Sequence, residues 1–384
     1  MRGSWPLILA LWGAGLGAAG QYAKFSVIYD LLSDAYPDGG VVLGWLVSVV
    51  GGVGIVLGVV AAMLVARVRY RRALLLSLWL GAAISALQAL LPPLPLMLAL
   101  RAVEGLSHLG LVVAAPTLIA QIATDRQRGL ALTLWGTFFG VAFAVMAWAG
   151  RPLAISAGLP ALFAVHAAYL AGFAIYLAPR LRRLPDEGDV ALMSVRSVLA
   201  THAAIYRSPA VVAPAAGWFF YTFCFVSILT VLPPYLDPAL RGAVMGAIPL
   251  VSIAVSMTLG VMLLRIMNAI GVVMLGFGFS ALAMVWLYLA PADPLACLAL
   301  AGAMGLIQGA SFAAVPQLNA TAMTQARANG AMAQMGNLGN TLGTPVMALA
   351  LAAYGYLSLP MLAGAAFAMG LVMHLILTRL RRNL

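Results

Sequence analysis

Charged residues are scarce in this 384-residue sequence: they make up 8% of the chain, while 64% of its residues are hydrophobic. A soluble domain carries about 25% charged residues. A soluble fold of this length also could not bury so much apolar surface, because surface area falls too slowly with size. The composition therefore excludes an ordinary soluble protein and indicates that lipid solvates most of the chain.

Motifs for metal binding and nucleotide hydrolysis are also missing. No C-x-x-C, H-E-x-x-H or G-x-x-x-x-G-K-[ST] pattern occurs. The two cysteines, Cys224 and Cys297, lie in apolar runs and do not report a redox compartment. The 19 methionines never combine with histidine at ligand spacing within one helix, and methionine is an ordinary packing residue. The sequence predicts no enzyme, no cofactor and no metal site, copper included.

Long apolar segments follow one another along the chain. A helix needs about 20 mostly apolar residues to cross a bilayer, and turn sequences such as Pro37-Asp38-Gly39-Gly40 separate segments of that length. The first segment exceeds the apolar core of a typical signal peptide, so it is assigned as a helix. We predict an all-α polytopic membrane protein with twelve transmembrane helices. Their ranges are 6–29, 41–65, 73–91, 96–121, 129–150, 157–178, 210–234, 243–264, 270–290, 295–320, 329–353 and 358–378.

The basic residues indicate the orientation in the membrane. On a soluble chain, a net charge of +11 would suggest a nucleic-acid partner. Here 17 of the 21 basic residues fall in loops of one side if the N-terminus is cytoplasmic, and only Arg151 and Arg241 fall in loops of the other side. This asymmetry follows the positive-inside rule. We expect a multi-pass protein of the bacterial inner membrane with both termini in the cytoplasm and no nucleic-acid partner.

A polar, charged connection divides the chain into two related halves. We predict an N-terminal six-helix bundle over 1–178, a cytoplasmic central loop over 179–209 and a C-terminal bundle over 210–384. At an offset of 200 residues, Gly105-Leu106 and Pro116 correspond to Gly305-Leu306 and Pro316. Chance matches in a chain rich in Gly, Ala and Leu are the alternative. The shared spacing favours a repeat about an axis along the membrane normal.

Two six-helix halves joined by a basic loop resemble the major facilitator superfamily (MFS) over the whole chain. The family pattern G-x-x-x-D-R-x-G-R-R after the second helix is eroded here: Arg67, Arg71 and Arg72 keep its basic part, whereas Ala66 replaces the acid and Arg69 the glycine. In the family this loop motif takes part in the conformational change, and the acid helps to latch the cytoplasmic side. The pattern R-x-x-x-G of the fourth helix is kept as Arg101 to Gly105. The Gly-Pro-rich fifth helix of drug antiporters is absent, which weakens a drug-antiport interpretation.

Ionisable residues inside the apolar segments are the first candidates for function, because such groups are costly in a bilayer unless they are paired or hydrated. Lys24, the only lysine, lies in the outer part of the first helix. Arg101, Glu104 and His108 lie within about 60° on one face of the fourth helix. The first and fourth helices line the central cavity of the resembled fold. We therefore predict a site for substrate and proton coupling, or else a charge cluster that only holds the helices together; Gln21 lies one turn from Lys24.

Polar and aromatic residues of the second half form a second, weaker set of candidates. They lie on the seventh, tenth and eleventh helices, but polar residues also join membrane helices structurally. The predicted cavity lining of the second half is Trp218, Tyr221, Thr222, Gln308, Ser311, Gln334, Asn337 and Thr341. His166, in the sixth helix, is predicted to pack between helices.

These observations favour a secondary active transporter that works by alternating access. Two cations against one acid favour an organic anion or a carboxylate-bearing metabolite as substrate, with proton symport through Glu104 or His108. We expect a monomer in the lipid bilayer. Two alternatives stay open: an exporter of hydrophobic compounds, and a transport-inactive relative that serves as a sensor or assembly factor.

Overall fold

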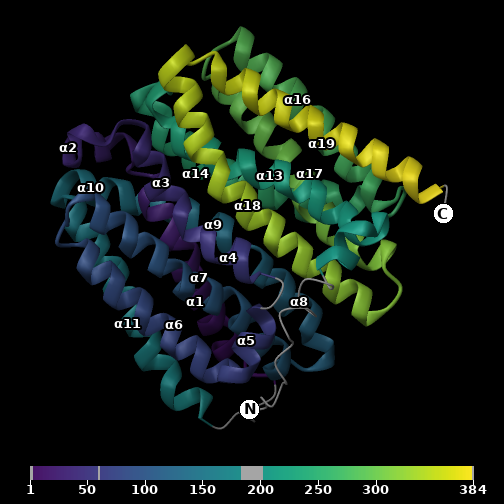
Figure 1. The fold of residues 1–384 in the computed structure, drawn as a ribbon, viewed down its shortest axis with the longest axis horizontal. Coiled ribbons are helices and arrows are strands. Elements are labelled where there is room, and N and C mark those ends of the chain that lie inside the picture. Colours follow the sequence, from purple (N-terminus) through teal and green to yellow (C-terminus); the bar gives the residue numbers. More distant parts are fainter. Residues whose placement is uncertain (1–2, 59–60, 183–201, 383–384) are drawn as a thin grey trace. The chain divides into compact units, whose positions relative to one another are not determined.

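The computed structural model describes residues 3–58, 61–182 and 202–382, and helices follow one another along these residues (Figure 1). No β-strand occurs within these three ranges. The predicted all-α class is therefore confirmed. Most of the predicted central loop 179–209 lies outside the described residues, as do Arg2, Arg183 and Arg196 of the basic set.

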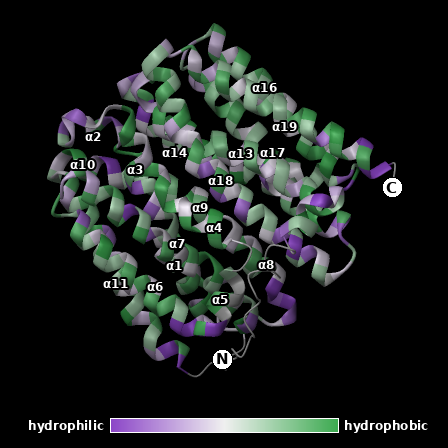
Figure 2. Cartoon of the chain, in the orientation of Figure 1, coloured by the Kyte–Doolittle hydropathy of each residue, from purple (hydrophilic) through white to green (hydrophobic). Residues whose placement is uncertain are grey.

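Apolar residues cover most of the helical ribbon (Figure 2), and nine helical runs of the described residues are long and apolar enough to cross a membrane. The nine are Pro37–Leu57, Leu94–Ile122, Phe138–Ala157, Leu159–Leu181, Pro209–Val231, Pro238–Leu263, Ala269–Leu289, Pro294–Leu318 and Ser358–Arg382. Three further predicted spans overlap α1 (Trp5–Ser26), α6 (Tyr70–Gln88) and α18 (Ala322–Tyr354). A multi-pass membrane protein is confirmed, whereas the count of twelve spans stays a prediction.

The chain forms two compact units. Unit 1 comprises Met1–Gly40 and Val60–Leu192, and unit 2 comprises Val41–Val59 and Met193–Leu384. These units differ from the two halves of the sequence at residues 41–59. That segment groups with unit 2 because α3 (Leu43–Ser48) and α4 (Gly52–Leu57) pack against α18.

Unit 1 is built around α1, which packs most extensively against three other helices. These are α7 (Leu94–Ile122), α9 (Phe138–Val145) and α11 (Leu159–Leu181), while α6 packs against α7 and α11. The shorter α5 (Ala61–Val68), α8 (Asp125–Gly136) and α10 (Arg151–Ala157) connect these elements. Buried aliphatic side chains of α1, α6, α7 and α11 share one apolar core.

A row of glycines on α1 lets α11 approach closely. Gly13, Gly17 and Gly20 are spaced four and three residues apart and so lie on one face of the helix. A Cβ atom on these positions would meet Phe173, Leu170 and His166 of α11, respectively. The small residues thus create the room in which His166 reaches the first helix.

Unit 2 repeats the helix pairs of unit 1. Its α13 (Pro209–Val231), α16 (Ala269–Leu289), α17 (Pro294–Leu318) and α19 (Ser358–Arg382) pack as α13–α17, α16–α17, α16–α19 and α13–α19. The corresponding pairs of unit 1 are α1–α7, α6–α7, α6–α11 and α1–α11. Two further helices, α14 (Pro238–Val255) and α18, pack against α17 and α13.

Candidate functional site

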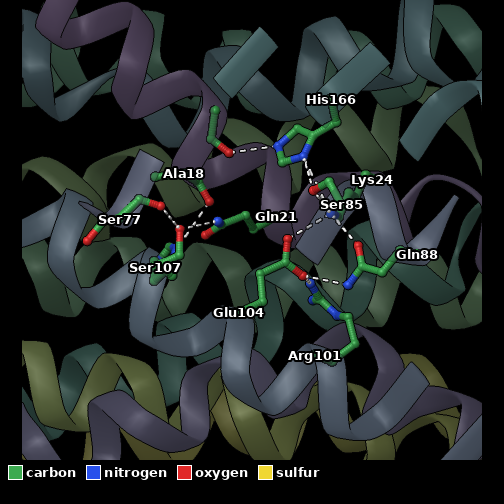
Figure 3. Close-up of polar contacts among 12 residues, drawn as sticks. Ala18, Gln21, Lys24, Ser77, Ser85, Gln88, Arg101, Glu104, Ser107 and His166 are labelled. Atoms are coloured by element: carbon green, nitrogen blue, oxygen red, sulfur yellow. Dashed lines mark hydrogen bonds and ion pairs between the residues drawn. The ribbon is translucent and has the colours of Figure 1, made fainter. Parts of the chain in front are cut away.

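A buried ion-pair cluster lies in the interior of unit 1 (Figure 3). Lys24 lies in the last turn of α1, and its side chain has no solvent exposure. Its Nζ atom donates hydrogen bonds to Glu104 Oε1 at 2.7 Å, Gln88 Oε1 at 2.6 Å and Ser85 Oγ at 2.7 Å. An ammonium group has three N–H donors, so all three have acceptors here.

Glu104 of α7 is the negative centre of this cluster. Its Oε1 atom accepts a hydrogen bond from Lys24. Its Oε2 atom accepts hydrogen bonds from Arg101 Nη1 at 2.5 Å and from Gln88 Nε2 at 2.9 Å. Arg101 lies one turn before Glu104 on the same helix, a spacing at which side chains meet. Its guanidinium also lies 4.4 Å from the ring centroid of Phe25. Two positive charges therefore surround one carboxylate, and all three side chains have no solvent exposure.

The structure extends the predicted site to α6 and α11. Ser85 and Gln88, three residues apart on α6, contact Lys24 directly. His166 of α11 lies against Ser85 Oγ at 2.8 Å, through its Nδ1 atom, and against the Gly17 carbonyl at 2.9 Å, through Nε2. His166 thus belongs to the polar network as well as to the packing of two helices. Sequence reasoning missed Ser85 and Gln88, although two polar residues on one face of an apolar helix were a usable signal.

Gln21 and His108 form a separate branch toward the other end of the helices. Gln21 donates to Ser107 Oγ at 2.8 Å, and Ser107 donates to the Ser77 carbonyl at 2.7 Å. His108 Nδ1 lies 3.0 Å from the Ala18 carbonyl, and its ring packs edge-on against Tyr22. The predicted residues of α1 and α7 therefore share one region of unit 1, but only three of them form the charged cluster.

The predicted lining of the second half divides into two groups. Trp218 stacks on Tyr221 with ring centroids 4.7 Å apart and packs edge-on against Phe312 of α17. Thr222, on the same helix, donates to the backbone carbonyl of Trp218 at 2.9 Å. Gln308 of α17 accepts from Ser252 at 3.4 Å, and Ser311 is buried.

The second group lies on α18 and packs against residues 41–58 of the same unit. Gln334 Nε2 donates to the Ile55 carbonyl at 2.9 Å, and Tyr206 donates to Gln334 Oε1 at 2.7 Å. Asn337 lies against Gly54, and the buried Thr341 lies one turn further along. Gln334 therefore links α18 to another segment of unit 2. Asn337 instead donates to the Ala333 carbonyl of its own helix, and the buried Thr341 hydroxyl has no hydrogen-bond partner among the described residues.

The eroded loop motif joins α5 and α6 in unit 1. Arg71 donates to the Arg182 carbonyl at 3.2 Å, and Arg67 and Arg72 lie on either side of it in the sequence. Arg69, which replaces the glycine of the family pattern, has a φ of 73°. This left-handed backbone favours glycine, so the structure explains why the pattern calls for one.

Glu104 is the one carboxylate buried within the described residues. In the part of the chain that the structure describes, no group of three His, Cys, Asp or Glu side chains could hold a metal ion.

Comparisons with known proteins agree with this architecture. The fold matches the crystal structure of a bacterial homologue of the human lysosomal transporter Spinster, in an inward-facing and unoccupied conformation, with a TM-score of 0.73. The match covers 98% of this chain and 95% of that chain at 14% sequence identity, so the likeness concerns the fold alone. No curated protein matches the sequence. The model of the Major Facilitator Superfamily matches residues 7–343, and the chain belongs to this family of membrane transporters.

Proposed function

We propose that this membrane transporter is a proton-coupled secondary transporter of a small organic anion, with Glu104 as the proton acceptor. One observation carries the proposal: Glu104 holds two cations, Lys24 and Arg101, with no solvent exposure of any of the three side chains. Ionisable residues within a bilayer are costly and mark transport pathways and proton relays. We further expect the protein to act as a monomer in the bacterial inner membrane.

The hydrogen bonds of Lys24 support an exchange mechanism. All three N–H donors of the ammonium are used, so an anion can reach it only by displacing an acceptor. Of the three acceptors of Lys24, Glu104 is the charged one, and protonation would neutralise its carboxylate. An anion that binds Lys24 and Arg101 would therefore favour the protonated form of Glu104, and a proton on Glu104 would favour the anion. This mutual effect is what thermodynamic linkage requires of two coupled ligands.

Alternating access supplies the step that opens the cluster. The three charged side chains are fully buried here, so an anion would bind in another conformation of the transport cycle. In this family type, rocking of two bundles exposes a central site to either side of the membrane. The closed cluster is then the substrate-free state, in which Glu104 replaces the anion.

Uptake into proteoliposomes tests the proposal. Purified protein is reconstituted, an inward proton gradient is imposed, and accumulation of a panel of radiolabelled organic anions is measured. Glu104→Gln should abolish accumulation driven by the gradient but spare exchange of the same anion across the membrane. Lys24→Ala should weaken binding of the anion itself, because it removes an attracting charge.

Two control variants sharpen this assay. Asp125→Asn removes an acid whose side chain is 93% exposed, so it should leave uptake unchanged. Glu104→Asp keeps a titratable carboxyl group and should retain coupling in part. If Glu104→Gln accumulates the anion with unchanged pH dependence, Glu104 is structural and the coupling scheme fails.

Export of hydrophobic compounds is the second candidate, and the aromatic group of unit 2 favours it. Trp218 contacts both Tyr221 and Phe312, and the Phe312 side chain is 52% exposed. Such rings bind apolar and cationic ligands. Quenching of tryptophan fluorescence by a hydrophobic cation, lost in Trp218→Leu and absent with organic anions, would favour this candidate.

A further inference from the structure

We propose that His166 is a positioning residue for Lys24, held as a neutral imidazole in a single tautomer. The inference rests on the proposed function, since it concerns how the same cluster directs the ammonium toward Glu104. The contacts that carry it run from the Gly17 carbonyl through His166 and Ser85 to Lys24. Figure 3 shows the part from His166 through Ser85 to Lys24.

The hydrogen bonds of His166 fix its tautomer. Nε2 lies 2.9 Å from the Gly17 carbonyl oxygen, which can only accept, so Nε2 carries a hydrogen. Nδ1 lies 2.8 Å from Ser85 Oγ, which can donate its hydroxyl hydrogen. In the neutral ring Nδ1 is then the acceptor. The chain has one direction: Lys24 donates to Ser85, Ser85 donates to His166, and His166 donates to Gly17.

The charges around the ring oppose a second hydrogen on it. Nδ1 of His166 lies 3.4 Å from Lys24 Nζ, so an imidazolium would place two cations in direct contact. Arg101 of α7 adds a further positive charge nearby, and Glu104 is the one negative group that faces the ring. The α6 neighbours, Ser85 and Gln88, are uncharged. While Lys24 is an ammonium, His166 is therefore neutral, and Glu104 is left as the position for an added proton.

Packing leaves the imidazole little freedom to take another arrangement. A Cβ atom on Gly20 would come within 2.9 Å of His166 Nε2, and Met146 closes the same space. The side chain of His166 is 2% exposed. The ring of His166 is thus held in place where α11 packs against α1. It orients the Ser85 hydroxyl, which accepts a hydrogen bond from Lys24.

His108 provides an internal contrast within the same unit. Its Nδ1 atom lies 3.0 Å from the Ala18 carbonyl, so the neutral ring carries its hydrogen on Nδ1. The two histidines of unit 1 that lie inside helices are therefore expected in opposite tautomers. Nitrogen NMR distinguishes the two tautomers and the imidazolium by their chemical shifts.

The sequence makes Lys24 observable by itself, because it is the only lysine of the chain. Protein labelled with nitrogen-15 lysine gives one side-chain ammonium resonance and one backbone amide resonance, both from Lys24. If His166 positions Lys24 through Ser85, then His166→Leu and Ser85→Ala should both move this resonance and speed its hydrogen exchange. His166→Gln, which offers a donor and an acceptor but cannot become a cation, should restore it in part. His202→Gln is the matched control and should leave it unchanged.

A second sample, labelled on the four histidines, tests the tautomer between about pH 5 and 8, where an unperturbed histidine titrates. The resonances lost in His166→Gln should show the Nε2–H tautomer throughout that range. An imidazolium signal from His166, the Nδ1–H tautomer, or a Lys24 resonance unmoved by His166→Leu would overturn the inference. These measurements need no substrate, so they stand whether or not Glu104→Gln loses coupling in the uptake assay, and a failure of either proposal is recognised separately.

Discussion

At the scale of single residues, Lys24 and Glu104 differ in what their removal leaves behind. Without Lys24, Arg101 still balances Glu104, as one positive charge against one negative charge. Without Glu104, two buried cations face each other with no counter-charge. Loss of one partner of a buried ion pair costs about 3–5 kcal/mol because an uncompensated charge stays buried.

We therefore expect Glu104→Gln to destabilise the protein more than Lys24→Met does. Thermal unfolding in one detergent, followed by tryptophan fluorescence, would measure both variants beside the wild type. The double variant Lys24→Met/Glu104→Gln should be more stable than Glu104→Gln alone, because it leaves one buried cation instead of two. A larger loss for Lys24→Met would show that Arg101 does not compensate Glu104.

Gly20 offers a second residue-scale prediction, because its missing side chain makes room for His166. Gly20→Ala would force a Cβ atom to within 2.9 Å of His166 Nε2, and overpacking of this kind typically costs about 1–3 kcal/mol. The matched control is Gly172→Ala on α11, where no neighbour lies within 4 Å. That substitution should stabilise its helix slightly, by about 1 kcal/mol or less. Equal melting temperatures for the two variants would contradict the packing argument.

The charged residues of the cluster could be predicted from the sequence, but several of their partners could not. Lys24 and Glu104 are conspicuous because Lys24 is the only lysine and Glu104 a carboxylate inside an apolar segment, and such charges need partners. Ser85, Gln88 and His166 carry no charge that marks them in the sequence. The packing of α6 against α7 and α11, and of α11 against α1, brings them to the Lys24 ammonium. Helical periodicity predicts which residues share one face of a helix, whereas the helix that packs against this face depends on the tertiary structure.

At the scale of elements, apolarity predicted the extent of the helical segments better than their interruptions. The described part of the single helix expected over 41–65 is divided among five elements. These are the 3₁₀ segment Pro37–Val42, α3, a 3₁₀ turn at Val49–Gly51, α4 and α5. Gly51, Gly52 and Gly54 lie at the junction of the 3₁₀ turn and α4. A glycine in a helix interior lowers helix stability by about 1 kcal/mol relative to alanine. The helix expected over 129–150 is likewise divided into α8, α9 and a π-helical turn at Met146–Gly150. Hydropathy does not register such breaks, because a window of about 19 residues averages the near-neutral glycines with their strongly apolar neighbours.

Arg69 gives an element-scale prediction at the junction of α5 and α6. It precedes α6 with φ 73° and ψ 128°, and such backbone strain costs a residue other than glycine about 1–3 kcal/mol. Arg69→Gly should relieve this strain and raise the melting temperature. The gain is reduced because glycine has a greater conformational entropy in the unfolded chain. Arg72→Gly, inside α6, should instead lower it. A drop for both variants would mean that Arg69 contributes more through its side chain than its backbone costs.

At the scale of the whole molecule, the two units support the repeat that the sequence predicted. The α7 and α17 helices begin at Leu94 and Pro294 and contain Pro116 and Pro316, respectively. Each packs against its counterpart neighbours, α1 and α6 in unit 1 and α13 and α16 in unit 2. The charges do not repeat among the described residues: their buried ion pairs lie in unit 1, and the corresponding helices of unit 2 carry aromatic and small polar residues.

Orientation in the membrane is the prediction that concerns the whole chain, and it follows from the unequal distribution of arginine. Basic loops stay in the cytoplasm because moving their charges across the membrane is opposed, so Arg126 and Arg128 should face inward and the Pro37–Gly40 and Pro291–Pro294 turns outward. Single cysteines are introduced at Gly129, Asp38 and Asp293 after the buried Cys224 and Cys297 are replaced by alanine. A membrane-impermeant maleimide added to intact cells should label the cysteines at positions 38 and 293 and not the one at 129. Permeabilised cells should show labelling at all three, which controls for access. If position 129 reacts from outside in intact cells, the orientation is inverted, and the outer position assigned to Lys24 is wrong with it.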